Sequence, residues 1–228
     1  MQIFIDSANT TEIEKWLNMG VIDGVTTNPS IMLKEGVYDA KAGAKEVAAL
    51  VRPSPVSVEV TTNDLDVMID QAREFASWAD NIVIKIPQIN QDGIPCYGVI
   101  RQLEDEGIRV NATVAMSLGQ VILSAKAGAT YISIFTGRVS DEGGNATEVI
   151  RNSVDWLERW EFKSRIIIGS IRSVGDILGA AIAGAHIITI PPAFLSKLAD
   201  HKYTRDTVRQ FVNDAQKAMA MMEEARVG

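Results

Sequence analysis

Short runs rich in isoleucine and valine recur along the chain, and each is followed by a stretch in which apolar residues return every three or four positions. A short apolar run bounded by turn residues is typical of a strand buried on both faces, and the longer spacing is typical of an amphipathic helix. The pattern therefore predicts alternating strands and helices. The eight predicted strands span residues 2–6, 24–27, 56–60, 82–86, 108–113, 130–135, 165–169 and 186–190. Helices are predicted between them, for example at residues 64–79, 96–106, 147–160 and 174–183.

Eight strand–helix units fit within 228 residues only if each takes about 28 residues, which leaves room for tight loops and little else. Parallel strands joined by right-handed helical crossovers either close into a barrel or form an open, doubly wound sheet. An open dinucleotide-binding sheet would carry a glycine-rich turn after its first strand, where this chain has DSAN at residues 6–9. We therefore predict a single-domain (β/α)8 TIM barrel over residues 1–228, with an extra C-terminal helix at residues 203–226.

The charge balance narrows the choice of partners. Lys and Arg number 22 and Asp and Glu number 29, so the net charge is −7. Such a field repels nucleic acid and anionic membranes, and neither is an expected partner. An anionic ligand must then be held by a local cluster of positive groups. Hydrophobic residues at 46% and charged residues at 22% are typical of a folded globular protein.

Cysteine and histidine are scarce in this chain. The lone Cys96 cannot form an internal disulfide, which favours a reducing compartment, and together with His186 and His201 it is too little for a zinc site. The N-terminal sequence MQIFIDSANT lacks the basic start of a signal peptide, and the apolar runs fall short of the ~20 residues of a membrane-spanning helix. We therefore expect a cytoplasmic location and no metal.

Polar side chains end or interrupt nearly every predicted strand. In a barrel of this kind the chemistry lies at the carboxyl ends of the strands, so polar residues there are candidates for a shared site. Residues two apart on a strand point to the same face, as Asn111 and Thr113 do. The candidates are Asp6, Thr26, Asn28, Glu59, Lys85, Asn111, Thr113, Ser133 and Ser170.

Lys85 lies within the apolar run IVIKIP and is the most informative of these residues. An ammonium in an apolar strand loses hydration, which favours the neutral amine that forms a Schiff base with a carbonyl. The alternative is a lysine whose stem packs in the core while its head reaches a carboxylate at the strand end. Asp6 and Glu59 could supply the acid–base steps around such an imine, or could serve as its ion-pair partner or as a helix N-cap.

Asn28 and two further residues suggest substrate binding. Asn28, in TTNPS, could orient a substrate hydroxyl or could simply form a turn before a helix. Arg138 and Arg172 each stand beside small residues at a strand-to-helix turn, where backbone amides and a guanidinium can hold a phosphate. The alternative for the two arginines is a pair of surface salt bridges. Barrel phosphate sites commonly use the last strands, which favours the phosphate interpretation for Ser170 and Arg172.

Five motifs in this order resemble the signatures of the transaldolase family, and more closely its small subfamily, which includes fructose 6-phosphate aldolase. They are FIDSA at residues 4–8, GVTTNPS at 24–30, VIKIP at 83–87, GRVSD at 137–141 and GSIR at 169–172. The resemblance covers the chain from residue 3 to about residue 198. It implies a (β/α)8 barrel that uses a Schiff-base lysine on its fourth strand and needs neither a metal nor an organic cofactor.

The resemblance also assigns roles to the candidate residues. It implies that Lys85 condenses with the C2 carbonyl of a ketose phosphate, and that Asp6 is the acid–base group at the C4 hydroxyl. Glu59 with Thr113 would hold a water that relays protons. The remaining roles concern binding. Asn28, Asn111 and Ser133 would hold the hydroxyls of the dihydroxyacetone unit, Thr26 and Phe135 would belong to the substrate site, and Arg138, Ser170 and Arg172 would bind phosphate.

The resemblance favours transfer of the three-carbon unit over its release. Transaldolases of the family carry Glu and Phe at positions 59 and 135, as this chain does, where the aldolase type has Gln and Tyr. A Tyr hydroxyl can polarise the catalytic water, and a Phe ring cannot. We therefore expect a transaldolase acting on fructose 6-phosphate or sedoheptulose 7-phosphate with an aldose phosphate acceptor. A fructose 6-phosphate aldolase-type lyase and a non-catalytic anion-binding barrel are the rival interpretations.

The segment at residues 114–120 departs from the family pattern and is expected to line the mouth of the pocket. A ketose with another anionic tail, such as a sulfonate, therefore stays open as the substrate. The resemblance also implies a homo-oligomer, a decamer or pentamer, in which the helix at residues 203–226 reaches a neighbouring subunit.

Overall fold

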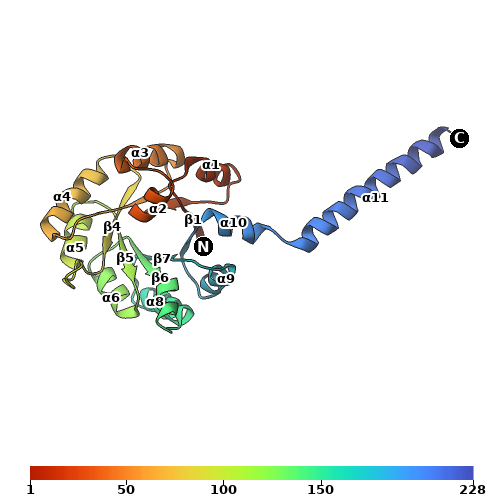
Figure 1. Cartoon of the computed structure of the whole chain (residues 1–228). Helices are drawn as coiled ribbons and strands as arrows, with labels where there is room; N and C mark the ends of the chain where they lie inside the picture. The colour runs from red at the N-terminus through yellow and green to blue at the C-terminus, as the bar shows by residue number, and fades with distance from the viewer. Residues whose placement is uncertain (228) are drawn as a thin grey trace. The chain divides into compact units, whose positions relative to one another are not determined.

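Eight parallel strands form one closed barrel, and each strand pairs with the next in chain order (Figure 1). The structure, a computed structural model, describes residues 1–227. Pairing of β1 with β8 closes the sheet. The predicted barrel is therefore confirmed, and the open doubly wound sheet is wrong. The strands are β1 (Gln2–Asp6), β2 (Gly24–Thr26), β3 (Val56–Glu59), β4 (Ile82–Pro87), β5 (Val110–Ala115), β6 (Tyr131–Phe135), β7 (Arg165–Gly169) and β8 (Ile187–Ile190).

The predicted strand positions agree with the structure within two residues. The largest difference is at β5, which begins at Val110 and continues to Ala115, because a β-bulge between Ala112 and Ala115 lets the strand extend past its predicted end. Val114 within the bulge has a positive φ of 61°, a conformation that β-branched residues rarely adopt.

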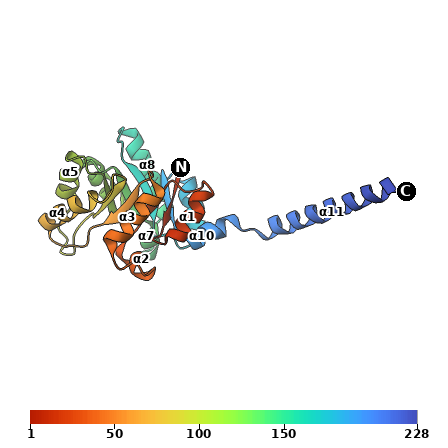
Figure 2. The same ribbon diagram turned by 90° about the horizontal axis from the view of Figure 1, so that it is seen from above.

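Several helices begin at capping residues that the sequence supplies, whereas α5 and α7 have no side-chain cap. Asn9, Asn28, Asp39, Ser117 and Asn145 each accept a backbone N–H of the first turn through the side chain, which satisfies a donor that the helix leaves unpaired. Neighbouring helices such as α1 and α3 lie side by side in both views (Figures 1 and 2). The helices are α1 (Thr10–Asn18), α2 (Pro29–Lys34), α3 (Ala40–Val51), α4 (Leu65–Ala76), α5 (Tyr97–Asp105), α6 (Leu118–Lys126), α7 (Thr136–Asp141), α8 (Ala146–Arg159), α9 (Val174–Ile182), α10 (Pro192–Ala199) and α11 (Lys202–Val227).

The chain divides into two compact units. The first spans Met1–Pro192 and contains the whole barrel, and the second begins at Ala193. The predicted C-terminal helix is confirmed as α11, and none of its described residues is buried. Its role in assembly stays a prediction. None of the helices formed by residues 1–227 combines the length and the apolar character that crossing a membrane requires.

An apolar layer fills the interior of the barrel. Its members come from five different strands, and the rings of Phe4 and Tyr131 meet edge to face with centroids 6.4 Å apart. Gly24 on β2 faces this layer, because a Cβ atom there would lie 2.7–2.9 Å from three atoms of the Phe4 ring. The buried members of the layer are Phe4, Val83, Tyr131, Ile167 and Ile187.

We predict that Gly24→Ala lowers the free energy of unfolding by about 1–3 kcal/mol, because the added Cβ would lie within 3 Å of the fully buried Phe4 ring and force it to shift. Urea unfolding at equilibrium measures the change. The control is Gly98→Ala on α5, where an added Cβ meets nothing within 4 Å. That variant should be as stable as the wild type or more stable, by up to about 1 kcal/mol. A Gly24→Ala protein of wild-type stability would contradict the close contact with Phe4.

Candidate active site

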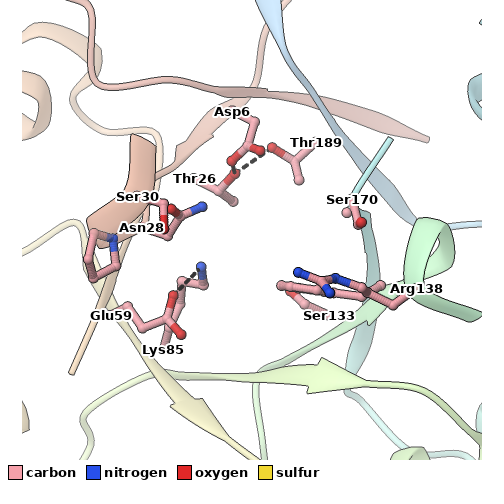
Figure 3. A pocket seen from close by; sticks show the side chains of 13 residues that line it. Asp6, Thr26, Asn28, Ser30, Glu59, Lys85, Ser133, Arg138, Ser170 and Thr189 are labelled. Atoms are coloured by element: carbon pink, nitrogen blue, oxygen red, sulfur yellow. Dashed lines mark hydrogen bonds and ion pairs between the residues drawn. The ribbon is translucent and has the colours of Figure 1, made fainter. Parts of the chain in front are cut away.

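A cavity of about 420 Å³ opens at the carboxyl ends of the strands, and polar side chains from most of the strands surround it (Figure 3). Nine of the twelve site residues that the sequence predicts line this cavity. Its lining residues are Asp6, Thr26, Asn28, Pro29, Ser30, Glu59, Lys85, Ser133, Phe135, Arg138, Gly169, Ser170 and Thr189.

On the five strands that form the apolar layer, the residue two positions after the layer lines the cavity. Asp6 comes two residues after Phe4, Lys85 after Val83, and the same spacing relates Ser133, Gly169 and Thr189 to the remaining members of that layer. Side chains two apart on a strand share a face, so a strand that contributes to the apolar floor also points its last inward side chain into the cavity. The fold thus brings polar residues from distant parts of the sequence to one opening.

Lys85 lies at the bottom of the cavity with only 5% of its side chain exposed. Its Nζ donates hydrogen bonds to the backbone carbonyl of Thr27 at 3.0 Å and to Glu59 Oε2 at 2.8 Å. The sequence left open a lysine whose head reaches a carboxylate at a strand end, and the structure has such an ion pair, with Glu59 at the end of β3. Because the partner carboxylate is in direct contact with the amine, Glu59 can take its proton.

Asp6 occupies another side of the cavity from Lys85 (Figure 3). Burial raises the pKa of this carboxyl above its ordinary value, and the negative charges of Glu35 and Glu59 raise it further. A hydrogen bond from Thr26 Oγ1 at 2.7 Å and the charge of Lys85 act in the opposite direction, but burial is the largest effect. A carboxylate with a raised pKa is a stronger base than an ordinary aspartate.

Thr189 extends this contact and is a site residue that the sequence analysis missed. Its hydroxyl lies 2.5 Å from Thr26 Oγ1. Because the single hydroxyl proton of Thr26 goes to Asp6, Thr189 must be the donor to Thr26. Thr189 was visible as the one polar residue of the strand IITI, at the inward position two residues after Ile187.

Asn111 and Thr113, two of the predicted site residues, do not line the cavity. Asn111 is fully buried and accepts a hydrogen bond from Ser133 Oγ at 2.7 Å, while its amide donates to Ser57 Oγ at 3.3 Å. It therefore supports Ser133 in this structure. Thr113 Oγ1 is buried and has no hydrogen-bond partner among residues 1–227. A buried hydroxyl of this kind is suited to holding a water.

Arg138 and Ser170 lie together on the side of the cavity opposite Lys85 and Glu59 (Figure 3). Ser170 follows β7 with a positive φ of 60°, and Gly137 allows the close approach of the two segments, because a Cβ there would collide with the Ser170 carbonyl oxygen. Uncommon backbone conformations of this kind concentrate at functional sites. The geometry leaves a guanidinium and a hydroxyl facing the same space.

The structure differs from the sequence interpretation at Arg172. This residue does not line the cavity, because its guanidinium forms an ion pair with Asp141 at the end of α7. Each partner stabilises the charge of the other, so the pKa of Asp141 is lowered and that of Arg172 is raised. Of the two arginines, Arg138 faces the cavity and Arg172 forms a half-exposed salt bridge. The segment at residues 114–120 likewise contributes none of the lining residues.

Comparisons with known proteins agree with this arrangement. The model of the family "Transaldolase/Fructose-6-phosphate aldolase" matches residues 3–227. A probable transaldolase of Lactiplantibacillus plantarum is 41% identical over 214 residues, which are 94% of this chain and 96% of the relative. A probable transaldolase of Clostridium botulinum is 41% identical over 218 residues, 96% of this chain and 98% of the relative. One of Dehalococcoides mccartyi is 39% identical over 214 residues, 94% of this chain and 97% of the relative.

Solved structures with low sequence identity share the fold. A thiamine phosphate pyrophosphorylase from Pyrococcus furiosus superposes with a TM-score of 0.57 at 13% identity, over 83% of this chain and 85% of its own. A mandelate oxidase mutant gives a TM-score of 0.57 at 13% identity, over 84% of this chain and 65% of its own. These two likenesses concern the barrel alone. The near full-length match to the family model and to the bacterial relatives shows that the chain belongs to the transaldolase/fructose-6-phosphate aldolase family.

Proposed function

We propose that this protein is a transaldolase that transfers a dihydroxyacetone unit from a ketose phosphate to an aldose phosphate through a Schiff base on Lys85. The observation that carries the proposal is a buried amine in contact with one carboxylate, Glu59, in a cavity that holds a second carboxylate with a raised pKa, Asp6. Formation of the Schiff base and cleavage of the carbon–carbon bond next to it move protons at different atoms, so each can use its own acid–base group.

The first step forms the imine. Glu59 accepts a proton from the Lys85 ammonium, and the neutral amine attacks the C2 carbonyl carbon of the ketose. The resulting carbinolamine loses its oxygen as water when Glu59 returns a proton, which leaves a protonated imine between Nζ and C2. A water held by Glu59 and the free hydroxyl of Thr113 would relay these protons. The nitrogen is neutral in the attacking amine and in the carbinolamine, and its positive charge returns when the protonated imine forms.

The second step breaks the bond between C3 and C4. Asp6 removes the proton of the C4 hydroxyl, C4 becomes the carbonyl carbon of the leaving aldehyde, and the electron pair of the bond moves to the imine nitrogen. The product is an enamine of the dihydroxyacetone unit on Lys85. The raised pKa of Asp6 suits this step, because it makes the carboxylate a better base.

The third step reverses the second with another aldehyde. The enamine attacks the acceptor carbonyl, and Asp6 returns its proton to the new alkoxide. Water then hydrolyses the imine and releases the new ketose. Phe135 in the lining supports transfer over hydrolysis of the enamine, because its ring has no hydroxyl with which to polarise water. Release of free dihydroxyacetone, as in an aldolase, is the second candidate, since the description of the matched family names both activities.

The side of the cavity opposite Lys85 is suited to the anionic end of the sugar. Arg138 and Ser170 place a guanidinium and a hydroxyl there, and both are typical ligands of a phosphate oxygen. A local group is needed because the chain as a whole carries a charge of −7. Asn28 and Ser30 lie on the same side as Lys85 and Glu59, Ser133 lies beside Arg138, and all three offer partners for the sugar hydroxyls.

Reductive trapping tests the Schiff base. Incubation with fructose 6-phosphate and borohydride should add one three-carbon unit to Lys85, which mass spectrometry of the digested protein locates. Asp6→Asn should form the imine but not cleave it, so its adduct should carry the intact six-carbon phosphate. Lys85→Met is the control that should trap nothing. An adduct on another lysine, or none in the wild type, would overturn the proposed mechanism.

The variant Phe135→Tyr tests the fate of the enamine. The added hydroxyl should polarise water next to the intermediate and raise the ratio of free dihydroxyacetone to transferred product severalfold. Both products can be followed from fructose 6-phosphate in the presence of an aldose phosphate acceptor. Phe135→Leu keeps an apolar side chain without the hydroxyl and should leave the ratio close to that of the wild type. An unchanged ratio in Phe135→Tyr contradicts the argument.

The variant Arg138→Gln tests the anion site. Loss of a charge-assisted hydrogen bond should raise KM for fructose 6-phosphate by about ten- to a hundredfold, with a much smaller effect on unphosphorylated fructose. Arg172→Gln is the matched comparison, and its effect should be the smaller one, because its guanidinium is occupied by Asp141. Equal losses on phosphorylated and unphosphorylated substrate in Arg138→Gln would show that this residue does not bind the phosphate.

A further inference from the structure

Glu35 follows α2 directly and lies outside the cavity lining, yet its carboxylate makes three contacts with the turn between β1 and α1. Oε2 accepts a hydrogen bond from the backbone N–H of Ala8 at 2.6 Å. Ser7 Oγ lies 3.0 Å from Oε1 and 3.1 Å from Oε2. Ser7 is fully buried and Glu35 is half-buried, so these contacts are partly shielded from solvent.

The turn that Glu35 holds begins at the residue after Asp6. Ser7 is further fixed by its backbone N–H, which donates to the carbonyl of Thr26 at 3.2 Å, and its Oγ accepts from the N–H of Asn9 at 3.1 Å. Without Glu35 the N–H of Ala8 would lose its partner, and the turn would lose the contact that fixes it from outside the barrel. The turn directly after Asp6 would then be held only by its contacts with β2 and by its own hydrogen bonds.

The same residue links this turn to a second part of the site. The α2 helix begins after Asn28, and Asn28, Pro29 and Ser30 at its N-terminal end line the cavity. Glu35 stands at the other end of this short helix. Its contacts therefore fix the position of α2 relative to the strand that bears Asp6.

Glu35 also places a charge near the reacting carboxylate. The charged groups that act on Asp6 come from three elements: Lys85 from β4, Glu59 from β3 and Glu35 from the end of α2. Lys85 has the largest effect of the three and favours a negative charge on Asp6, whereas Glu35 and Glu59 each disfavour it. The Thr26 hydroxyl on β2 opposes them by donating to Asp6 Oδ1.

We propose that Glu35 is a positioning residue for Asp6: its carboxylate holds the turn after β1 in place and sets a negative charge beside the Asp6 carboxylate. This inference rests on the proposed function, in which Asp6 carries the proton of the C4 hydroxyl. Glu35 touches neither the cavity nor a reacting atom, so it acts only through Asp6 and its turn.

Two substitutions separate the two parts of this role. Glu35→Gln keeps the length of the side chain and one acceptor oxygen but removes the charge, so the pKa of Asp6 should fall. Glu35→Asp keeps the charge but is one methylene shorter, so it cannot make all the contacts with Ser7 and Ala8. Glu46→Gln on the exposed face of α3 removes the same charge from a residue remote from these contacts and serves as the matched control.

The experiment measures the pH dependence of kcat/KM for transfer in the wild type and the three variants. Transfer requires ionised Asp6, so activity falls as the pH drops through the pKa of this group. In Glu35→Gln this acidic limb should move to lower pH by about half a unit or more. In Glu35→Asp the limb should stay near its wild-type position while kcat falls about tenfold, since misplacement of a catalytic group by 1 Å costs more than this. Glu46→Gln should match the wild type in both respects.

Titration of the Asp6 carboxyl by carbon-13 NMR, assigned with Asp6→Asn, gives a readout that does not depend on turnover. It should show the same downward shift in Glu35→Gln. A limb and a titration that remain at the wild-type pH would overturn the inference, as would a Glu35→Asp protein with wild-type kcat. Borohydride trapping separates this failure from failure of the proposed function. If the wild type does not trap the sugar on Lys85, the function is wrong, whereas normal trapping with an unmoved limb rejects the role of Glu35 alone.

Discussion

The structure depends on one electrostatic constraint, the burial of the Lys85 ammonium inside the barrel. Removing a charge from water costs several kcal/mol, and a protein tolerates it only when the charge is paired and hydrogen-bonded. Glu59 and the Thr27 carbonyl provide these partners, and they come from the strand next to β4 and from the end of β2. The register of β2, β3 and β4 is therefore tied to the site, because a shift by one residue would turn a partner away and leave the charge unpaired.

The alternation of side chains along the strands explains how a compact barrel can carry such a group at all. The apolar layer below the cavity closes the interior, and the next inward position on each contributing strand is polar or glycine. Core and site are thus two successive layers of the same strands. Asp6, Glu59 and Lys85 thus lie on strands of the barrel, and none of the three depends on a loop for its position. Short loops are consequently no disadvantage to the chemistry.

Much of the fold and of the candidate site could be predicted from the sequence, because a polar residue that interrupts an apolar strand is visible without a structure. Lys85 shows this most clearly, and Thr189 has the same signature although it was overlooked. The contacts of Arg172 and Glu35 could not be predicted. Arg172 pairs with Asp141, 31 residues away, and Glu35 contacts a turn 27 residues away. Such choices of partner depend on how the ends of outer helices lie against the barrel, which periodicity does not encode.

The hydrogen bond between Thr26 and Thr189 joins residues 163 positions apart, while the contact of Lys85 with Glu59 spans only 26. Lys85 and Glu59 lie on neighbouring strands and can thus come together before long-range loop closure is complete. The environment of Asp6 is different, because it is finished only when the last strand pairs with the first. A chain that ends before β8 lacks Thr189, and with it the hydroxyl that donates to Thr26 beside Asp6. In the mechanism proposed above, the setting of Asp6 thus depends on barrel closure, whereas the contact between Lys85 and Glu59 does not.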